Sequence, residues 1–282
     1  MGDIGLSPEA FNDLNSKGLH KVHLTGEKAT LLIPLYAKAL DSHSKHSILN
    51  DEKSAEIIQM IDYDFEKLKR FGNGNIMVVR AKQYDEWIRE FLISNPDGVV
   101  LNLGCGLDTR ISRINPPSTV SWFDVDFPEV IDERQKFYSN QAGYEMLASS
   151  ITESKWLQKI QKGKPVIVIA DGVFAYLTEE QVKELLNRIT DYFPCGQIAF
   201  DVMNSYAVKM GKNRLREISG GEHRWAAEDI KRVDELDPKL KRKDTLTLLG
   251  SKYLPLKYRL LFGVALILPR YKNMMRLLRY WF

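Results

Sequence analysis

The chain has 282 residues, of which 44% are hydrophobic and 27% are charged, and these fractions are ordinary for a globular protein. They exclude a collagen-like, low-complexity or wholly disordered chain, and the most apolar run, residues 260–268, is far shorter than the roughly 20 residues of a membrane span. The net charge of +3 hides an asymmetry, because residues 231–282 hold 13 Lys and Arg against 4 Asp and Glu.

This basic segment has two interpretations. A concentration of positive charge suits nucleic acid or an anionic membrane surface. The commoner origin of such a run, including KLKRK at residues 239–243, is a solvated face around ordinary helices. We therefore expect no nucleic-acid partner, and the role of the basic quarter stays open.

Cysteine usage and the first residues bear on the compartment. The two cysteines, Cys105 and Cys195, are 90 residues apart, which suits a reducing environment and excludes a disulfide scaffold or a thiolate zinc site. MGDIGLSPEA lacks a basic region followed by an apolar run, and its sixth residue is Leu where an N-myristoylation site needs Ser or Thr. We expect a cytoplasmic protein with no membrane span.

Helical patterns dominate residues 1–95. Between residues 27 and 40, with Pro34 as an expected kink, apolar side chains recur on one side: Leu31, Leu32, Leu35, Tyr36 and Leu40. Residues 76–93 repeat the pattern with Val79, Ile88, Phe91 and Leu92. No Gly/Ser linker follows, so we expect residues 1–95 to form a helical cap on one domain, residues 96–282, in a single compact unit.

The middle of the chain predicts alternating strands and helices. Four short apolar runs have strand length: GVVLNLG (98–104), TVSWFDVD (119–126), PVIVIAD (165–171) and QIAFDV (197–202). Helical patterns separate them, and one helix begins at a capping box, Thr178 with Gln181, and ends before Pro194. This alternation predicts an α/β fold with a doubly wound, mostly parallel sheet covered on both faces.

The pattern weakens after residue 205. DTLTLLG and the terminal RLLRYWF are compatible with edge strands, and residues 253–268 with a helix.

Each predicted strand is followed by polar residues. They are Gly104 to Asp108, Asp124 with Asp126, Asp171, and Asp201 with Asn204. In open α/β sheets the ligand binds beyond the carboxyl ends of the strands, so these residues form a site hypothesis.

The turn GCGLDT distinguishes two cofactor classes. A dinucleotide fold uses a third glycine, but Thr109 stands at that place, and Asp108 would repel a pyrophosphate. S-adenosylmethionine has no phosphate and tolerates an acid there. It also needs a carboxylate after the second strand for its ribose hydroxyls, and Asp126, at the strand tip, is preferred to Asp124.

Three motifs resemble the leucine carboxyl methyltransferase family, and more closely its tetracenomycin-type polyketide O-methyltransferase branch. They are VVLNLGCGLDTRISRI, VSWFDVDFPEVIDERQKFY and IADGVFAYLTEEQVKELL. Three earlier segments also resemble that branch, so the likeness spans about residues 20–205; they are LTGEKATLLIPLYAKALDS, IDYDFEKL and VVRAKQYDEWIREFL. The resemblance implies a class I S-adenosylmethionine-dependent methyltransferase fold, Rossmann-like and seven-stranded, with S-adenosyl-L-methionine as methyl donor.

The resemblance also implies roles for single residues. Arg80 would pair with the carboxylate of the methionine part, and Gly104 and Gly106, with Cys105 between them, would lie against that part. Asp126 would hold the ribose. Asp171 would lie near the amino group, Ser150 and Ile151 would flank the adenine, and Tyr176 fills the tyrosine position of its motif.

Methyl transfer from a sulfonium needs no covalent enzyme intermediate. A carboxylate acceptor needs no base, whereas a phenol usually does. The motif region has no histidine, which favours a carboxylate or an acidic enol, and His223 is the candidate base outside it. Asp201 and Asn204 are candidates to line the acceptor pocket.

Several residues have competing interpretations. Cys105 as a nucleophile would need a nearby base, and a small residue between two glycines is the simpler interpretation. The pairs His20 with His23 and His43 with His46 have metal-ligand spacing but no further ligand, so we expect no metal. Either Arg110 and Arg113 reach an anionic acceptor or they lie exposed on the following helix. Asp108 and Thr109 are expected to cap that helix.

The sequence therefore predicts an O-methyltransferase that acts on a carboxylate or acidic hydroxyl of a small metabolite or polyketide-like natural product. Within that class, the alternative acceptor is the C-terminal carboxylate of a protein. In another class, the alternative is a non-catalytic protein that keeps the fold and binds a partner.

Overall fold

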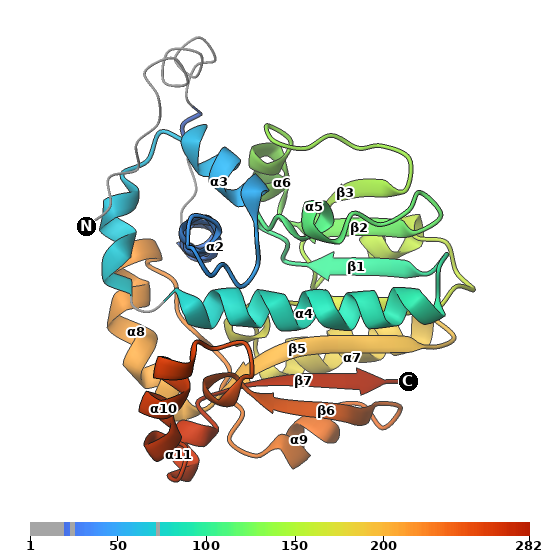
Figure 1. Ribbon diagram of the computed structural model, residues 1–282. Coiled ribbons are helices and arrows are strands. Elements are labelled where there is room, and N and C mark those ends of the chain that lie inside the picture. The colour runs from blue at the N-terminus through green and yellow to red at the C-terminus, as the bar shows by residue number, and fades with distance from the viewer. Residues whose placement is uncertain (1–19, 23–25, 72–73) are drawn as a thin grey trace.

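A computed structural model describes residues 20–22, 26–71 and 74–282 (Figure 1). The expectation that the chain starts without a targeting signal concerns residues outside this part. Across the described residues, no helix combines the length and apolar character required to cross a membrane.

A seven-stranded sheet forms the centre of the molecule. Its strands are β1 (Val99–Leu103), β2 (Ser121–Asp126), β3 (Tyr144–Ala148), β4 (Val166–Ala170), β5 (Gly196–Met203), β6 (Lys241–Thr247) and β7 (Met275–Trp281). Their order is β3-β2-β1-β4-β5-β7-β6, with β1 to β5 parallel and β7 antiparallel to both its neighbours. The predicted doubly wound α/β fold is confirmed.

Two strands differ from the sequence prediction. The segment RLLRYWF forms β7, which lies between β5 and β6 and so is an interior strand, not an edge strand. This position explains its fully buried Leu277, Leu278 and Tyr280. The pattern of apolar runs also missed β3, whose exposed Ala148 and half-buried Glu145 interrupt the run at a sheet edge.

Helices cover both faces of the sheet, as the parallel order requires. On one face lie α4 (Asn75–Ser94), α5 (Arg110–Ile114) and α6 (Pro128–Arg134), and on the other lies α7 (Glu179–Tyr192), with η3 (Lys155–Lys159) and α9 (Ile230–Asp234). The predicted capping box of α7 is present, with Thr178 and Gln181 bonding reciprocally. Helix α4, assigned above to the cap, instead packs on the sheet through Trp87, Ile88 and Phe91.

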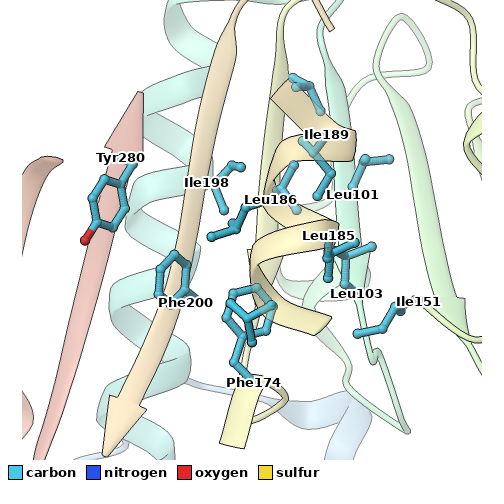
Figure 2. Close-up of a cluster of buried hydrophobic side chains, with 14 of the residues drawn as sticks. Leu101, Leu103, Ile151, Phe174, Leu185, Leu186, Ile189, Ile198, Phe200 and Tyr280 are labelled. Atoms are coloured by element: carbon cyan, nitrogen blue, oxygen red, sulfur yellow. The ribbon is translucent and has the colours of Figure 1, made fainter. Parts of the chain in front are cut away.

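The core beneath α7 is shown in Figure 2. Side chains of β1 and β5 meet one apolar stripe of α7; the residues are Leu101, Leu103, Ile198, Phe200, Leu185, Leu186 and Ile189. Phe200 lies between Phe174, with ring centroids 4.7 Å apart, and Tyr280, at 5.6 Å. The buried strands thus fix the sheet edge at which the polar residues gather.

The cap consists of η1 (Gly26–Leu31), α2 (Leu32–Ser42), α3 (Glu52–Gln59) and η2 (Phe65–Phe71). Its own cluster contains Leu32, Leu35, Tyr36 and Ile57, and it reaches the turn after β1 through Leu107. Pro34, expected to kink a helix, lies in the first turn of α2, where proline is tolerated, and Leu40 is exposed. The cap therefore closes over the carboxyl ends of the strands.

The short helix η4 (Phe174–Tyr176) follows β4, and the C-terminal part contributes α8 (Ser205–Ser219), η5 (Leu248–Gly250), α10 (Leu256–Ala265) and α11 (Pro269–Lys272). Helix α8 lies at the carboxyl edge below the cap in Figure 1 and contacts η1. The helix expected within residues 253–268 is present as α10.

Candidate active site

A cavity of about 690 Å³ lies at the carboxyl ends of β1, β2, β4 and β5, between the cap and α8. All but one of the predicted site residues line it: Arg80, Gly104, Cys105, Gly106, Asp126, Ser150, Ile151, Asp171, Tyr176, Asp201 and His223. Asn204 lies elsewhere. Its side chain accepts from Ala207 N at 2.9 Å, which caps α8, and donates to the carbonyl of Arg270 at 2.9 Å.

The glycine turn after β1 has a backbone that only glycine adopts without strain. Gly104 and Gly106 have φ values of 61° and 50°. A Cβ on Gly104 would lie 2.5 Å from Cγ2 of Val173, so no side chain fits there. Buried Arg134 holds the turn from behind, donating to the carbonyls of Gly106 at 3.2 Å and Asp108 at 2.6 Å.

The two acids of β2 have different environments. Asp124 is fully buried and accepts from Asn102 at 2.9 Å, Trp122 at 3.0 Å and Tyr144 at 2.7 Å, and it also pairs with Arg134. Every oxygen of Asp124 is engaged within the protein, so this acid supports the sheet rather than a ligand.

Asp126 instead faces the cavity. One of its oxygens accepts from Gly106 N and the other from Phe127 N, both at 2.8 Å. Burial raises the pKa of Asp126 to about 6, although these two backbone bonds oppose the rise. A carboxylate oriented by backbone N–H groups with lone pairs left over suits a pair of ligand hydroxyls.

Arg80 of α4 lies between two acids of the cavity. Its Nε is 2.5 Å from Oδ1 of Asp171, and its Nη1 is 3.4 Å from Oδ2 of Asp201. Asp201 also accepts from Gly172 N at 2.6 Å, and burial raises its pKa. Gly172 has a φ of 74°, and a Cβ there would lie 2.8 Å from Nη2 of Arg80. Glycine at 172 thus makes room for the guanidinium.

The side chains of Arg110 and Arg113 are buried, so they do not lie exposed on the following helix. Their contacts are with protein groups rather than with an open acceptor site. Arg110 donates to Asp85 at 3.0 Å, Asn102 at 3.1 Å and Asp171 at 2.8 Å. Arg113 contacts Asp85, Asp51 and Thr109, each at 2.7 Å. Neither is exposed, and both have their donors engaged by the protein.

Asp108 and Thr109 make no side-chain cap on α5, contrary to expectation. Asp108 forms ion pairs with Lys38, Arg110 and Arg113. Burial alone would raise the pKa of Asp108, but these cations hold it well below its usual range. Thr109 bonds Asp51 and Arg113. Lys38, which lines the cavity and pairs with Asp108, was not predicted as a site residue, because one lysine within an apolar helix pattern carries no signal of burial.

Tyr176, His223 and residues of α8 also line the cavity. The rings of Tyr176 and His223 meet edge to face, 5.0 Å apart. Nδ1 of His223 is buried without a hydrogen-bond partner among the described residues, and burial lowers the pKa of its imidazole, which favours the neutral ring. Four apolar side chains belong to the same lining: Met77, Met203, Leu215 and Met275.

The side chains fit S-adenosylmethionine group by group. Arg80 and Asp171 line the cavity with Nε and Oδ1 2.5 Å apart, so the carboxylate and the ammonium of a ligand would meet opposite charges there. Asp126 suits ribose hydroxyls, and half-buried Ser150 and buried Ile151, which the resemblance assigns to the adenine, line the same cavity.

The alternative chemistries find no geometric support. Cys105 is buried, and desolvation raises the pKa of its thiol well above its usual range, which disfavours the reactive thiolate. Among the described residues, no three His, Cys, Asp or Glu side chains form a group that would bind a metal ion, while His23 lies outside them.

Comparisons with known proteins agree with the motifs. The family model described as leucine carboxyl methyltransferase matches residues 31–190. Over 267 residues the chain is 34% identical to the tetracenomycin polyketide synthesis O-methyltransferase TcmP of Streptomyces glaucescens, covering 93% of this chain and 98% of that protein. It is 30% identical over 252 residues to the S-adenosyl-L-methionine-dependent methyltransferase dpfgK of Gibberella zeae, covering 81% and 85%.

Solved structures share the fold at much lower identity. A candidate methyltransferase from Thermobifida fusca YX has a TM-score of 0.57 at 12% identity and covers 86% of this chain and 93% of its own. A DUF574 family protein from Streptomyces avermitilis MA-4680 has a TM-score of 0.57 at 10% identity, with 91% and 97% covered. The strand order and these neighbours confirm the class I methyltransferase fold.

Proposed function

Because the chain belongs to the leucine carboxyl methyltransferase family and is an S-adenosylmethionine-dependent O-methyltransferase, we propose that it methylates an ionised or acidic oxygen of a small, largely apolar, polyketide-like metabolite. The observation that carries the proposal is the lining of the cavity at the carboxyl ends of the strands. Charged groups that suit the cofactor share this cavity with His223, whose pKa is lowered by burial, and with the apolar side chains of Met77, Met203, Leu215 and Met275.

The cofactor end would be held by residues already in place. S-adenosylmethionine supplies an electrophilic methyl group when bound. Arg80 and Asp171 would bind its carboxylate and ammonium, Asp126 its ribose, and the turn at Gly104 and Gly106 allows close approach of the backbone. Holding two reactants in line lowers the activation free energy by up to roughly 7–11 kcal/mol, so positioning alone is enough for a large rate enhancement.

The acceptor end favours an acidic oxygen. Three cations of the cavity wall, Lys38, Arg80 and Arg110, are paired with protein carboxylates. Arg224 also lines the cavity, is exposed, and has no described carboxylate within 4 Å. Arg224 therefore offers a counter-charge to an acceptor anion, and the neighbouring His223 offers a hydrogen bond to it.

The same two residues separate a carboxylate from a hydroxyl acceptor. A carboxylate is already ionised at pH 7 and needs only orientation by His223 and Arg224. A phenol or enol would give its proton to the imidazole of His223, which lines the cavity and whose pKa is lowered by burial, so that the neutral, proton-accepting ring is favoured. His223 thus acts as an orienting donor in one case and as a general base in the other.

The test uses the purified protein with methyl-labelled S-adenosylmethionine and a panel of aromatic acids, the matched phenols and the matched neutral alcohols. Labelled product is expected from acids or acidic phenols and not from the alcohols. Product from the alcohols alone would contradict the proposal, as would calorimetry that shows no heat of cofactor binding.

The variant His223→Asn distinguishes the two acceptor types. With a carboxylate acceptor, the variant should raise KM and leave the shape of the pH profile unchanged. With a hydroxyl acceptor, it should lower kcat and abolish the limb of the profile that follows histidine deprotonation. Tyr176→Phe is the matched control, because it keeps the ring against His223 and removes only the hydroxyl.

A further inference from the structure

Helices α10 and α11, the turn between them and the segment just before α10 present an exposed surface of apolar and basic side chains, here named the α10–α11 surface. Its apolar members and their exposed fractions are Leu256 (66%), Leu260 (68%), Leu261 (67%), Ile267 (77%) and Leu268 (49%). Its basic members are Lys252, Lys257, Arg259, Arg270 and Lys272, all exposed. In Figure 1 the two helices stand together below α8, away from the sheet.

The exposed leucines belong to a helix that is already packed. Tyr258 and Phe262 form the inner side of α10, with their rings stacked 6.2 Å apart and packed against the core beneath α4. Leu256 and Leu260 are one turn apart, and Leu261 is one turn from Lys257, so aliphatic and basic side chains share the outer side. The outer leucines therefore do not belong to this core, whose contacts with α10 are made by Tyr258 and Phe262.

The positive charge of this surface is not neutralised by the protein. Residues 245–282 contain seven Lys and Arg and no Asp or Glu. None of the five basic members has a salt bridge to a carboxylate in the described part of the chain, and three lie over tyrosine rings instead: Lys252, Lys257 and Arg270, at 4.9, 4.9 and 4.8 Å. The surface thus selects an anionic partner.

We propose that the α10–α11 surface binds the face of a membrane that contains anionic phospholipid. Aliphatic side chains bordered by Lys, Arg and Tyr are the composition of helices that lie in the membrane interface, where the apolar chains enter the lipid and the cations meet phosphates. The tyrosines beside the cations suit the headgroup level. The proposed contact is peripheral, since among the described residues no helix has the length and apolar character of a membrane span.

The charge of the surface argues against other occupants. A second copy of the chain in a two-fold dimer would place five cations opposite five cations. Nucleic acid would neutralise the cations but would leave the exposed leucines in water. A lipid surface satisfies both kinds of side chain at once.

The surface is joined to the wall of the active-site cavity. Tyr271 of α11 packs edge to face on Tyr206 of α8, at 5.5 Å, and Asn204 donates to the carbonyl of Arg270 at 2.9 Å. Helix α8 in turn lines the cavity through Gly211 and Leu215. Binding at a membrane would therefore bring this wall near lipid, where an apolar acceptor partitions.

Co-sedimentation of the purified protein with vesicles tests the proposal. Wild type should pellet with phosphatidylcholine vesicles that contain phosphatidylglycerol, not with phosphatidylcholine alone, and less so at high salt. The double variant Leu260→Glu, Leu261→Glu should lose about tenfold or more in partitioning, since two large apolar contacts are replaced by repelled charges. Ile93→Glu is the matched control, because Ile93 is 83% exposed at the far end of α4.

Three results would overturn the proposal. They are absence of wild-type binding to the anionic vesicles, equal binding by the double variant and wild type, and a dimer in sedimentation analysis that the double variant abolishes. Circular dichroism and turnover without vesicles verify that the double variant is folded, since neither leucine lines the cavity. Failure at the vesicles with normal turnover would refute this inference and leave the proposed methyl transfer intact.

Discussion

Arg110 donates from Nη2 to Oδ2 of Asp171 at 2.8 Å, while the other oxygen of the same carboxylate lies 2.5 Å from Nε of Arg80. A fully buried arginine on α5 thus fixes the orientation of an acid that lines the cavity. Arg110 also contacts Asp85 and Asp108, so one side chain connects α4, the turn after β1 and the end of β4.

The first prediction concerns this arginine. Arg110→Met should lower the free energy of unfolding by about 3–5 kcal/mol, because the change leaves buried carboxylates without their cation. Denaturant titration measures the loss, and Lys183→Met on the exposed side of α7 is the control. A loss below about 1 kcal/mol, the range of surface substitutions, would show that Arg110 is not the centre of the network.

The second prediction concerns cofactor binding at Asp126. Asp126→Asn should weaken the binding of S-adenosylmethionine at pH 7 by about tenfold or more, since ribose hydroxyls lose a charged acceptor. Wild-type affinity should also fall as the pH drops below about 6, where the raised pKa lets Asp126 protonate. Isothermal titration calorimetry at several pH values tests both. Unchanged affinity in the variant would place the ribose elsewhere.

The third prediction concerns the stability of the same variant. The pKa of Asp126 is raised from 3.8 to about 6 by burial, so the folded protein binds more protons than the unfolded chain between these values. Its ionisation therefore costs stability as the pH rises through that window, and the cost persists above it. Asp126→Asn exchanges one acceptor oxygen for an NH2 group, which costs a backbone hydrogen bond at every pH. The stability of wild type relative to the variant should therefore fall by about 1–3 kcal/mol between pH 3 and pH 7, as denaturant titration at several pH values would measure. A difference between the two proteins that does not change with pH would contradict this.

The fourth prediction uses a pair of glycines. Gly104→Ala should lower both stability and cofactor affinity, because the new Cβ would lie 2.5 Å from Val173 in addition to the strain of a positive φ. Gly163→Ala has the same kind of strain at φ 92° but nothing within 4 Å, and should cost only about 1–2 kcal/mol of stability. Equal losses in thermal denaturation for both variants would mean that the contact with Val173 is unimportant.

The fifth prediction concerns Cys105. Cys105→Ala should keep turnover, measured by transfer of labelled methyl, because the thiol is buried and its pKa is raised. A stability loss of about 1 kcal/mol, typical of a small core truncation, is expected. Complete loss of turnover in a folded variant would revive a catalytic thiolate.

The sequence predicted the sheet edge well for a physical reason. Strands buried on both faces must be continuous apolar runs, and such runs end where polar residues meet solvent or ligand, as at Asp126 and Asp171. β3 and β7 were harder: the first has a mixed pattern at an edge, and the position of β7 between β5 and β6 depends on pairing that no local pattern records.

Burial of charge was the part that the sequence did not reveal. Nothing in the sequence distinguishes Arg110 and Arg113 from surface arginines. Only the fold brings three carboxylates around them, those of Asp51, Asp85 and Asp108. Asn204 illustrates the reverse. Its place after β5 suggested a ligand contact, but the start of α8 immediately after it uses the side chain as a cap.

The ion pairs of Lys38 with Asp108 and of Arg113 with Asp51 join the cap to the glycine turn and α5. Opening the cap alone would break both ion pairs and would expose the apolar cluster that the cap shares with Leu107. We therefore expect the amide hydrogens of α2 to exchange with deuterium only when the sheet itself unfolds, as in one cooperative unit. Such exchange would mean that a ligand enters the cavity without displacing α2.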